Sequence, residues 1–415
     1  MGCSQVTKAW LERFGVAPKR FRDGTHRVCP PDETLTAVGP RMGEFGITRL
    51  ADVTGLDIIG IPVYMAVRPN ARSLSVSQGK GLDRAAAKSS ALMESIEGWH
   101  AEHIQLPLRY ASYAELRGTM PTVDITQLPL RRGGSLDLVK PMLWVEGYEL
   151  VTSAEMLVPF ECVSTYYVQP DRLGNTFLKD SNGLASGNHI LEAMVHGLCE
   201  TVERDACTLW TTSGGMRCTD RKLDLSSISD PNTAAVIEQL QRAKFAVGVW
   251  DVTSDTGIPT FFCRLVDAPG APRWAFQGLF GGQGCHLDSR VAILRALTEA
   301  AQGRLTQIAG ARDDMSNSGG QVDPEEVRVA AEIVEAAGSV PFRDEDLSTD
   351  SFEGDVEILV KAIQGVSLNS VIVVDLSHHE KRIPVVRMIV PGLEPPDDHP
   401  EYVPGPRALA VAAAQ

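Results

Sequence analysis

Three glutamates on one predicted helix are the first residues in this chain whose types and spacing could do chemistry. Glu192, Glu200 and Glu203 fall within an arc of about 80° on one face of a helix. Carboxylates gathered in this way repel each other, so a site that collects them needs cations. Hard oxygen ligands suit Mg²⁺, and Mg²⁺ held by few carboxylates usually brings substrate phosphates with it.

Two further predicted helices carry charged residues at helical spacing. Glu94 and Glu97 form an i, i+3 pair on one, and Glu299 and Arg304 lie on the other. Arg304 projects with apolar neighbours, which predicts either that it is buried against an anion or a carboxylate or that its charged end extends to solvent. Taken singly, a glutamate pair such as Glu94 and Glu97 also fits a solvated charged face, which is the commoner case.

Polar groups at the entrances of these helices extend the set. Lys80 is flanked by glycines just before a predicted helix, where an anion is favoured, although the surrounding residues do not fit the Walker A pattern. Asn188 lies one turn before Glu192. His196 projects on the same arc and could transfer a proton. Arg204 follows Glu203 and is also compatible with a simple salt bridge.

The elements that must position these residues repeat one order. The order strand, loop, helix occurs three times, and the three helices begin close to residues 84, 188 and 288. Residues 75–81 and 281–286 are predicted as glycine-containing loops. This order predicts an α+β fold whose helices meet around one site. The predicted helices cover residues 84–103, 188–212, 289–309, 324–337 and 353–365. The predicted strands cover residues 57–67, 142–150, 155–159, 165–168, 245–251, 260–267, 274–280, 371–376 and 384–390.

Bulk properties exclude several classes of partner. The chain has 415 residues and a net charge of −14, so we expect no nucleic acid partner. It has no run of 18 apolar residues, so we expect no membrane partner. Its eight cysteines form no CxxC pair, and we expect free thiols in a cytoplasmic protein.

At these residues the chain resembles the YcaO family. The resemblance covers roughly residues 45–395, and residues 24–27, 46–57 and 390–394 are similar to the stand-alone, TfuA-associated branch. It implies a YcaO-type ATP-binding fold, in which long helices pack on mixed and antiparallel sheets around a nucleotide site. We expect an N-terminal extension at 1–45, the catalytic domain at 46–395 and a tail rich in proline and alanine at 396–415. The matching stretches are residues 77–81, 90–97, 181–188, 200–206 and 297–304.

The resemblance implies ATP and Mg²⁺ as cofactors and a peptide as substrate. A nucleophile adds to a backbone carbonyl, and ATP phosphorylates the resulting oxygen. We expect thioamide formation with a TfuA-like partner, and a homodimer would fit the family. The tail lacks the Pro-x-Pro-x-Pro ending of many azoline-forming members. The alternatives are an azoline- or amidine-forming cyclodehydratase and a nucleotide-binding accessory protein.

The resemblance also implies roles for single residues. Arg204 and Arg304 are catalytic candidates, and His196 is added to them from its position on the helix rather than from the resemblance. The candidates for contacts with ATP are Ser77, Lys80, Glu94, Asn188, Arg204 and Arg304. The candidate ligands of Mg²⁺ are Glu94, Glu97, Glu192, Glu200 and Glu203.

Overall fold

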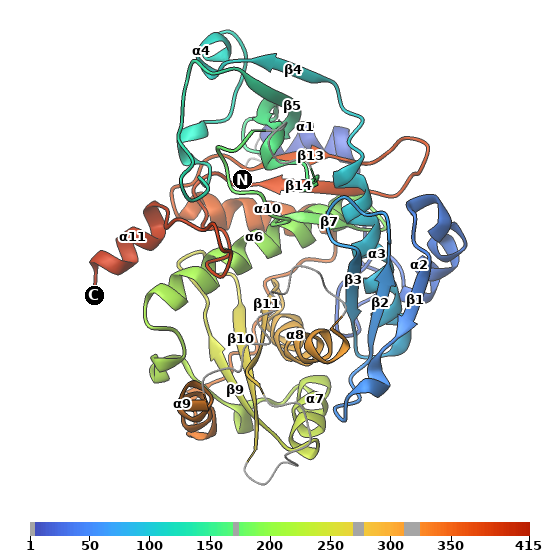
Figure 1. Cartoon of the computed structure of the whole chain (residues 1–415), viewed down its shortest axis with the longest axis vertical. Coiled ribbons are helices and arrows are strands. Elements are labelled where there is room, and N and C mark those ends of the chain that lie inside the picture. The colour runs from blue at the N-terminus through green and yellow to red at the C-terminus, as the bar shows by residue number, and fades with distance from the viewer. Residues whose placement is uncertain (1–4, 169–173, 269–277, 311–323) are drawn as a thin grey trace.

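Three strand–helix units surround the centre of the molecule. The computed structural model describes residues 5–168, 174–268, 278–310 and 324–415. Each helix contacts its own strand and the strand of another unit, since α3 contacts β7, α6 contacts β11 and α8 contacts β3. The units therefore form a closed circuit, and Figure 1 shows their helices meeting in the middle. They are β3 (Val76–Lys80) with α3 (Arg84–Glu102), β7 (Leu184–Ser186) with α6 (Ile190–Thr212), and β11 (Phe280–Cys285) with α8 (Ser289–Ala309).

Antiparallel sheets carry the three units. One sheet has the order β1–β2–β3, a second has the order β11–β10–β9, and a six-stranded sheet has the order β4–β5–β13–β14–β7, with β6 also paired to β5. A short parallel pair joins β8 and β12. The α+β fold is thereby confirmed. The other strands are β1 (Arg49–Asp52), β2 (Val63–Val67), β4 (Leu108–Ala111), β5 (Met142–Glu149), β6 (Ala154–Pro159), β8 (Leu223–Asp224), β9 (Phe245–Asp251), β10 (Thr260–Asp267), β12 (Val340–Pro341), β13 (Ile372–Asp375) and β14 (Val385–Ile389).

Two segments that were predicted as glycine-containing loops are strands. Residues 76–80 form β3 and residues 280–285 form β11. Their glycines allow a helix to pack closely: a Cβ at Gly79 would lie 1.9 Å from the backbone nitrogen of Ala91 in α3. A Cβ at Gly284 would likewise lie 2.1 Å from the carbonyl oxygen of Ala292 in α8. These glycines mark close helix–strand contact rather than a turn.

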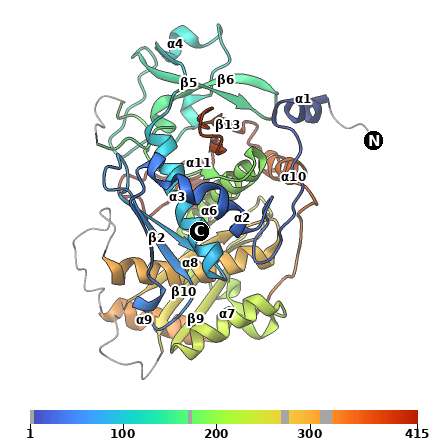
Figure 2. The ribbon, with the colours of Figure 1, turned by 90° about the vertical axis from the view of Figure 1, so that its right-hand side faces the viewer.

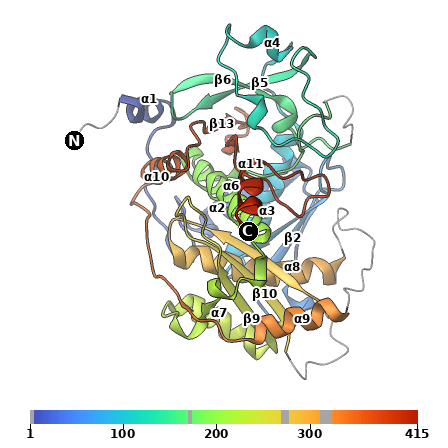
Figure 3. The ribbon, with the colours of Figure 1, turned by 90° about the vertical axis from the view of Figure 1, so that its left-hand side faces the viewer.

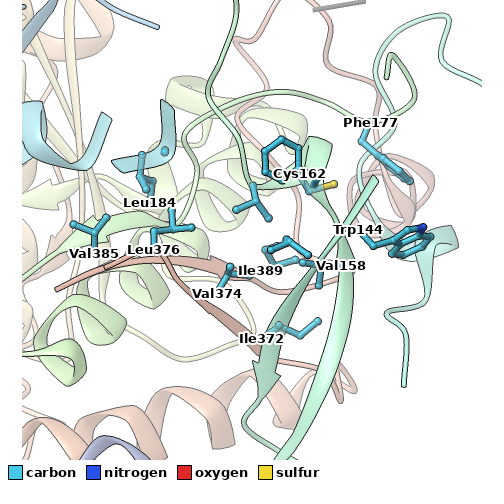
Figure 4. Packing of buried hydrophobic residues seen from close by; sticks show 14 of the residues in the cluster. Trp144, Val158, Cys162, Phe177, Leu184, Ile372, Val374, Leu376, Val385 and Ile389 are labelled. Carbon is cyan, nitrogen blue, oxygen red and sulfur yellow. The ribbon is translucent and has the colours of Figure 1, made fainter. Parts of the chain in front are cut away.

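The largest apolar core lies between the six-stranded sheet and α3. Figure 4 shows Trp144, Ile372 and Val374 from the sheet packed in this cluster. A second core lies on the other face of β14, where Met388 contacts the cluster of α6 and α10 (Phe352–Gly365). Because successive residues of β14 alternate between these cores, Arg387 projects toward the α3 side.

The two ends of the chain both fold back onto the central helices. Figure 2 shows α2 (Pro31–Val38) beside α3, in accord with their contacts. The buried pair Lys19–Asp355, at 2.5 Å, ties the N-terminal segment to α10. Figure 3 shows α11 (Pro406–Ala413) beside α6, where Arg407 donates two hydrogen bonds to Asp205 at 2.8 and 2.9 Å. The remaining helices are α1 (Gln5–Phe14), α4 (Tyr113–Leu116), α7 (Pro231–Arg242) and α9 (Pro324–Glu335).

Most of the predicted helices and strands form, with three differences. Residues 57–62 and 165–168 are not strands, and most of the predicted strand 274–280 lies outside the described residues. The predicted helix over residues 289–309 is confirmed, and the side chain of Asp288 caps it by accepting from the backbone N–H of Arg290. Within the described ranges, no helix combines the length and apolar character that crossing a membrane requires.

Candidate active site

A cavity of about 740 Å³ lies where the three units meet. Side chains of α3, α6 and α8 line it, together with residues 77–80 of β3 and a loop of the N-terminal segment. On α6 the lining residues are Glu192, His196, Glu200 and Arg204, each four positions after the last, so they share one face. The sequence-predicted set on this helix is thereby brought together, apart from Glu203.

The carboxylates of α3 and α6 face each other across the cavity. Glu97 is buried, and its Oε1 accepts hydrogen bonds from the backbone N–H of Ser186 at 2.8 Å and from the Ser186 hydroxyl at 2.6 Å. Burial raises the pKa of Glu97 to about 8, and the charges of Glu94 and Glu200 add to the shift. Burial likewise raises the pKa of Glu200 to about 7. Both groups bind protons near neutral pH, which lowers the repulsion between them.

Lys80 anchors a charge network on the α8 side. Its Nζ lies 2.6 Å from the Glu299 carboxylate. Burial alone would raise the pKa of Glu299, but Lys80 and Arg204 together lower it to about 2. Arg204 donates to the Gln283 side chain at 2.7 Å. Glu299 is therefore ionised and holds two cations at the cavity wall.

His196 is a neutral imidazole inside the cavity. Burial lowers its pKa well below the usual value, and the charges of Arg295, Arg27 and Lys80 lower it further. A neutral imidazole can accept a proton, whereas an imidazolium cannot. The same environment disfavours the imidazolium that proton uptake would form, so His196 is a weak base in this state of the cavity.

The N-terminal segment contributes residues that the sequence did not single out for the site. Arg27 lines the cavity, and its Nε lies 3.6 Å from Glu192 Oε1. The backbone N–H of Val28 donates to Glu192 Oε2 at 2.8 Å. The Thr34 hydroxyl donates to Asn188 Oδ1 at 2.9 Å, so two of the predicted site residues are held by a segment that was expected to be a separate extension.

Arg304 is not among the residues that line the cavity, and its contact with ATP stays a prediction. Its Nε donates to Asp57 Oδ2 at 2.9 Å, and both side chains are only 2% exposed. The guanidinium also stacks over Phe245 and Phe280, in each case 4.9 Å from the ring centroid. The prediction that Arg304 is buried against a carboxylate is confirmed. Arg295, which shares the helix face of Glu299, lines the cavity instead.

Glu203 also lies behind the cavity wall rather than on it. Its Oε2 accepts a hydrogen bond from the backbone N–H of Cys285 at 2.8 Å, and the residue is 1% exposed. The role of Glu203 as a ligand of Mg²⁺ stays a prediction. Glu203 differs from Glu94, Glu97 and Glu200, which line the cavity directly.

The donor set fits Mg²⁺ together with a polyphosphate better than a metal held by protein alone. In the part of the chain that the structure describes, no three His, Cys, Asp or Glu side chains cluster closely enough to hold a metal ion. Carboxylates and cations nevertheless line the same cavity, and Mg²⁺ commonly takes one or two carboxylates plus phosphate oxygens. The carboxylates that could share the ion are Glu94, Glu97, Glu192 and Glu200. The residues placed to contact phosphate or nucleotide are Arg27, Ser77, Lys80, Asn188, Arg204 and Arg295.

Comparisons with known proteins agree with this chemistry. A family model described as YcaO cyclodehydratase, ATP- and Mg²⁺-binding, matches residues 78–394. A protein in the tfuA 3′ region of Rhizobium leguminosarum bv. trifolii is 35% identical over 399 residues, which cover 92% of this chain and 91% of that protein. A protein of Methanothermobacter thermautotrophicus is 35% identical over 394 residues, which cover 90% and 96%.

Solved structures share the fold. YcaO from Methanopyrus kandleri, bound with AMPPCP and Mg²⁺, aligns with a TM-score of 0.72 and 24% identity over 94% of this chain and 98% of that one. A heterocyclase in complex with substrate and cofactor aligns with a TM-score of 0.71 and 22% identity. The alignment covers 92% of this chain but 54% of the heterocyclase. The relative in the tfuA 3′ region confirms the resemblance to the TfuA-associated branch, and the chain belongs to the YcaO family of ATP- and Mg²⁺-binding proteins.

Proposed function

We propose that this chain activates a backbone amide of a peptide by phosphorylating the amide oxygen with ATP, and that the product is a thioamide. The observation that carries the proposal is the cavity itself. Its carboxylates suit Mg²⁺, and the cations Arg27, Lys80, Arg204 and Arg295 suit phosphate groups. Phosphoryl transfer needs positioning and charge compensation, which this arrangement supplies.

In the proposed reaction, hydrosulfide adds to the carbonyl carbon and the electron pair of the C=O double bond moves to oxygen. That oxygen attacks the γ-phosphorus of ATP, and the bond to the leaving ADP breaks. The C–O bond then breaks, phosphate departs, and C=S forms as the S–H proton is lost. His196, whose neutral imidazole lines the cavity, is the candidate to take this proton.

The choice of thioamide formation rests on two observations. A relative that is 35% identical is encoded in the tfuA 3′ region, which favours a TfuA-like partner as the source or carrier of sulfur. The C-terminal tail packs on α6 through Arg407 and Asp205 and does not line the cavity. A tail in that place is unlike the active-site tail implied for azoline-forming members.

Mass spectrometry of peptides tests the reaction. Peptides from a strain that lacks this chain are incubated with the chain, its TfuA-like partner, ATP, Mg²⁺ and sulfide. We expect a mass gain equal to the difference between sulfur and oxygen, only when ATP is present. Loss of one water instead would overturn thioamide formation in favour of cyclodehydration. No mass change, with nucleotide still bound, would favour an accessory protein.

A further inference from the structure

One end of the cavity lies beyond the predicted nucleotide-binding residues. The cavity follows α3 from Asp83 at its N-terminus to Gly98, which is roughly 22 Å along the helix axis. The glutamates and most of the cations face its middle and the side of the N-terminal segment. The cavity lining toward the Gly98 end includes Arg68 and Ser73, which lie against Gly98, together with Thr165, Tyr167 and Leu184. None of the residues assigned above to ATP or Mg²⁺ belongs to this wall.

Thr165 presents a buried hydroxyl without a partner at this end. The residue is 2% exposed, and its Oγ1 makes no hydrogen bond with the described part of the protein. Two backbone hydrogen bonds fix its position. The backbone N–H of Thr165 donates to the carbonyl oxygen of Ala101 at 3.2 Å, and the backbone N–H of Tyr167 donates to the carbonyl oxygen of Arg72 at 3.0 Å. A buried hydroxyl that is left unsatisfied is costly, so its place on a cavity wall indicates a ligand that completes it.

Arg387 supplies a second set of unused donors next to this wall. It is paired directly opposite Leu184 in the sheet, and Val385 is paired opposite Ser186, so Arg387 projects on the face that holds Leu184 and Ser186. Arg387 is 5% exposed, and its Nη2 donates to Asp180 at 2.8 Å. Its Nε and Nη1 are buried and have no partner among the described residues.

The charge balance at this end suits a neutral polar ligand. Arg387 is neutralised by Asp180, and the nearby Arg68 is paired with Glu102 at 2.8 Å. In the part of the chain that the structure describes, both of these cations are therefore already paired with a carboxylate, while Leu184 supplies apolar surface. A carbonyl oxygen accepts hydrogen bonds but carries no net charge. A peptide backbone therefore matches both the unused hydrogen-bond donors and the neutral charge balance at this end of the cavity.

We propose, on the basis of the proposed function, that the wall of Gly98, Thr165, Tyr167 and Leu184 binds the backbone of the substrate peptide. The Thr165 hydroxyl donates to a peptide carbonyl oxygen. Arg387 lies beside Leu184 in the sheet and keeps two buried N–H donors next to this wall. The nucleotide then occupies the middle of the cavity, and the amide to be activated lies where the two parts meet at Glu97.

The test removes one hydroxyl without changing the shape of the side chain. The chain is loaded with Mg²⁺ and a non-hydrolysable ATP analogue, and the probe is N-acetylglycylglycinamide, a peptide backbone without side chains. Titration followed by ligand-observed saturation-transfer NMR gives the Kd of the probe for wild type and for Thr165→Val. The matched control is Thr208→Val, because Thr208 is equally buried but donates to Pro395 at 2.8 Å, away from the cavity.

We expect Thr165→Val to weaken binding of the probe by roughly threefold to tenfold, as the loss of one hydrogen bond does. Its affinity for the ATP analogue and its thermal midpoint should not fall. Thr208→Val should lower the midpoint and leave the Kd of the probe unchanged. Equal binding of the probe to wild type and Thr165→Val, or no binding to wild type, would overturn the subsite. Failure of wild type to bind the ATP analogue would instead count against the proposed function.

Discussion

Binding of Mg²⁺ and nucleotide should release protons from the buried glutamates. Glu97 has a pKa of about 8 and Glu200 a pKa of about 7, both raised by burial. At pH 7, Glu97 is therefore about nine-tenths protonated and Glu200 about half protonated, which is about 1.4 protons together. Carboxylates bind a metal ion in the ionised form, so these protons have to leave when the ion enters.

Isothermal titration calorimetry measures this number directly. The chain is titrated with Mg²⁺ and a non-hydrolysable ATP analogue in buffers that differ in ionisation enthalpy, and the slope of the observed enthalpy gives the protons released. We expect about one proton or slightly more at pH 7, and close to none at about pH 9, where both groups are already ionised. As the pH rises, the apparent affinity for Mg²⁺ and the ATP analogue should increase by roughly tenfold per pH unit over the range in which binding releases one proton.

The control is Glu161→Gln, since Glu161 is another buried glutamate whose pKa is raised by burial, but it does not line the cavity. This variant should release the same number of protons as wild type. If no protons are released at pH 7, or if as many are released at about pH 9, Glu97 and Glu200 do not meet the metal ion in the way that the cavity indicates.

Substitutions of five cations, one of them an exposed control, test how the roles of the cations are divided. Arg295→Met should weaken binding of the nucleotide by about 10-fold to 150-fold, which is the effect of one charged hydrogen bond. Arg304→Met should leave the Kd for nucleotide nearly unchanged. It should lower the free energy of unfolding by about 3–5 kcal/mol, because the buried carboxylate of Asp57 is left without its positive partner. The opposite pattern would restore Arg304 as the contact with ATP. Lys19→Met should lower the free energy of unfolding in urea by about 3–5 kcal/mol, because it breaks the buried pair with Asp355. The exposed control Lys361→Met should lower it by less than about 1 kcal/mol. Equal losses would show that the buried pair does not hold the N-terminal segment in place. Arg27→Met should raise the Kd for nucleotide by about 10-fold or more by fluorescence titration, and an unchanged Kd would remove the N-terminal segment from the site.

Helical periodicity predicted one wall of the site well. Because α6 is a regular helix, the four-residue spacing of Glu192, His196 and Glu200 was enough to place them on one face of the cavity. The same argument applied to α8 would have favoured Arg295, which lies one turn before Glu299. Arg304 lies on the opposite, apolar side of that helix, where it contacts a buried carboxylate.

Long-range contacts were beyond this kind of reasoning. Nothing local in residues 21–34 shows that Arg27 and Thr34 reach Glu192 and Asn188, more than 150 residues away. The glycine strands were missed for a related reason. A glycine such as Gly284 indicates a loop when only its neighbours in sequence are considered, whereas here it permits the close packing of α8.

The fate of the amide oxygen tests the central claim most directly. A peptide that the chain modifies is prepared with ¹⁸O in the carbonyl of the modified residue and is incubated with the chain, its TfuA-like partner, sulfide, ATP and Mg²⁺. If the amide oxygen is phosphorylated, the label appears in inorganic phosphate, with one labelled phosphate for each peptide modified. Label that stays in the peptide or enters water, while unlabelled phosphate is formed, would contradict phosphorylation of the amide oxygen in this cavity.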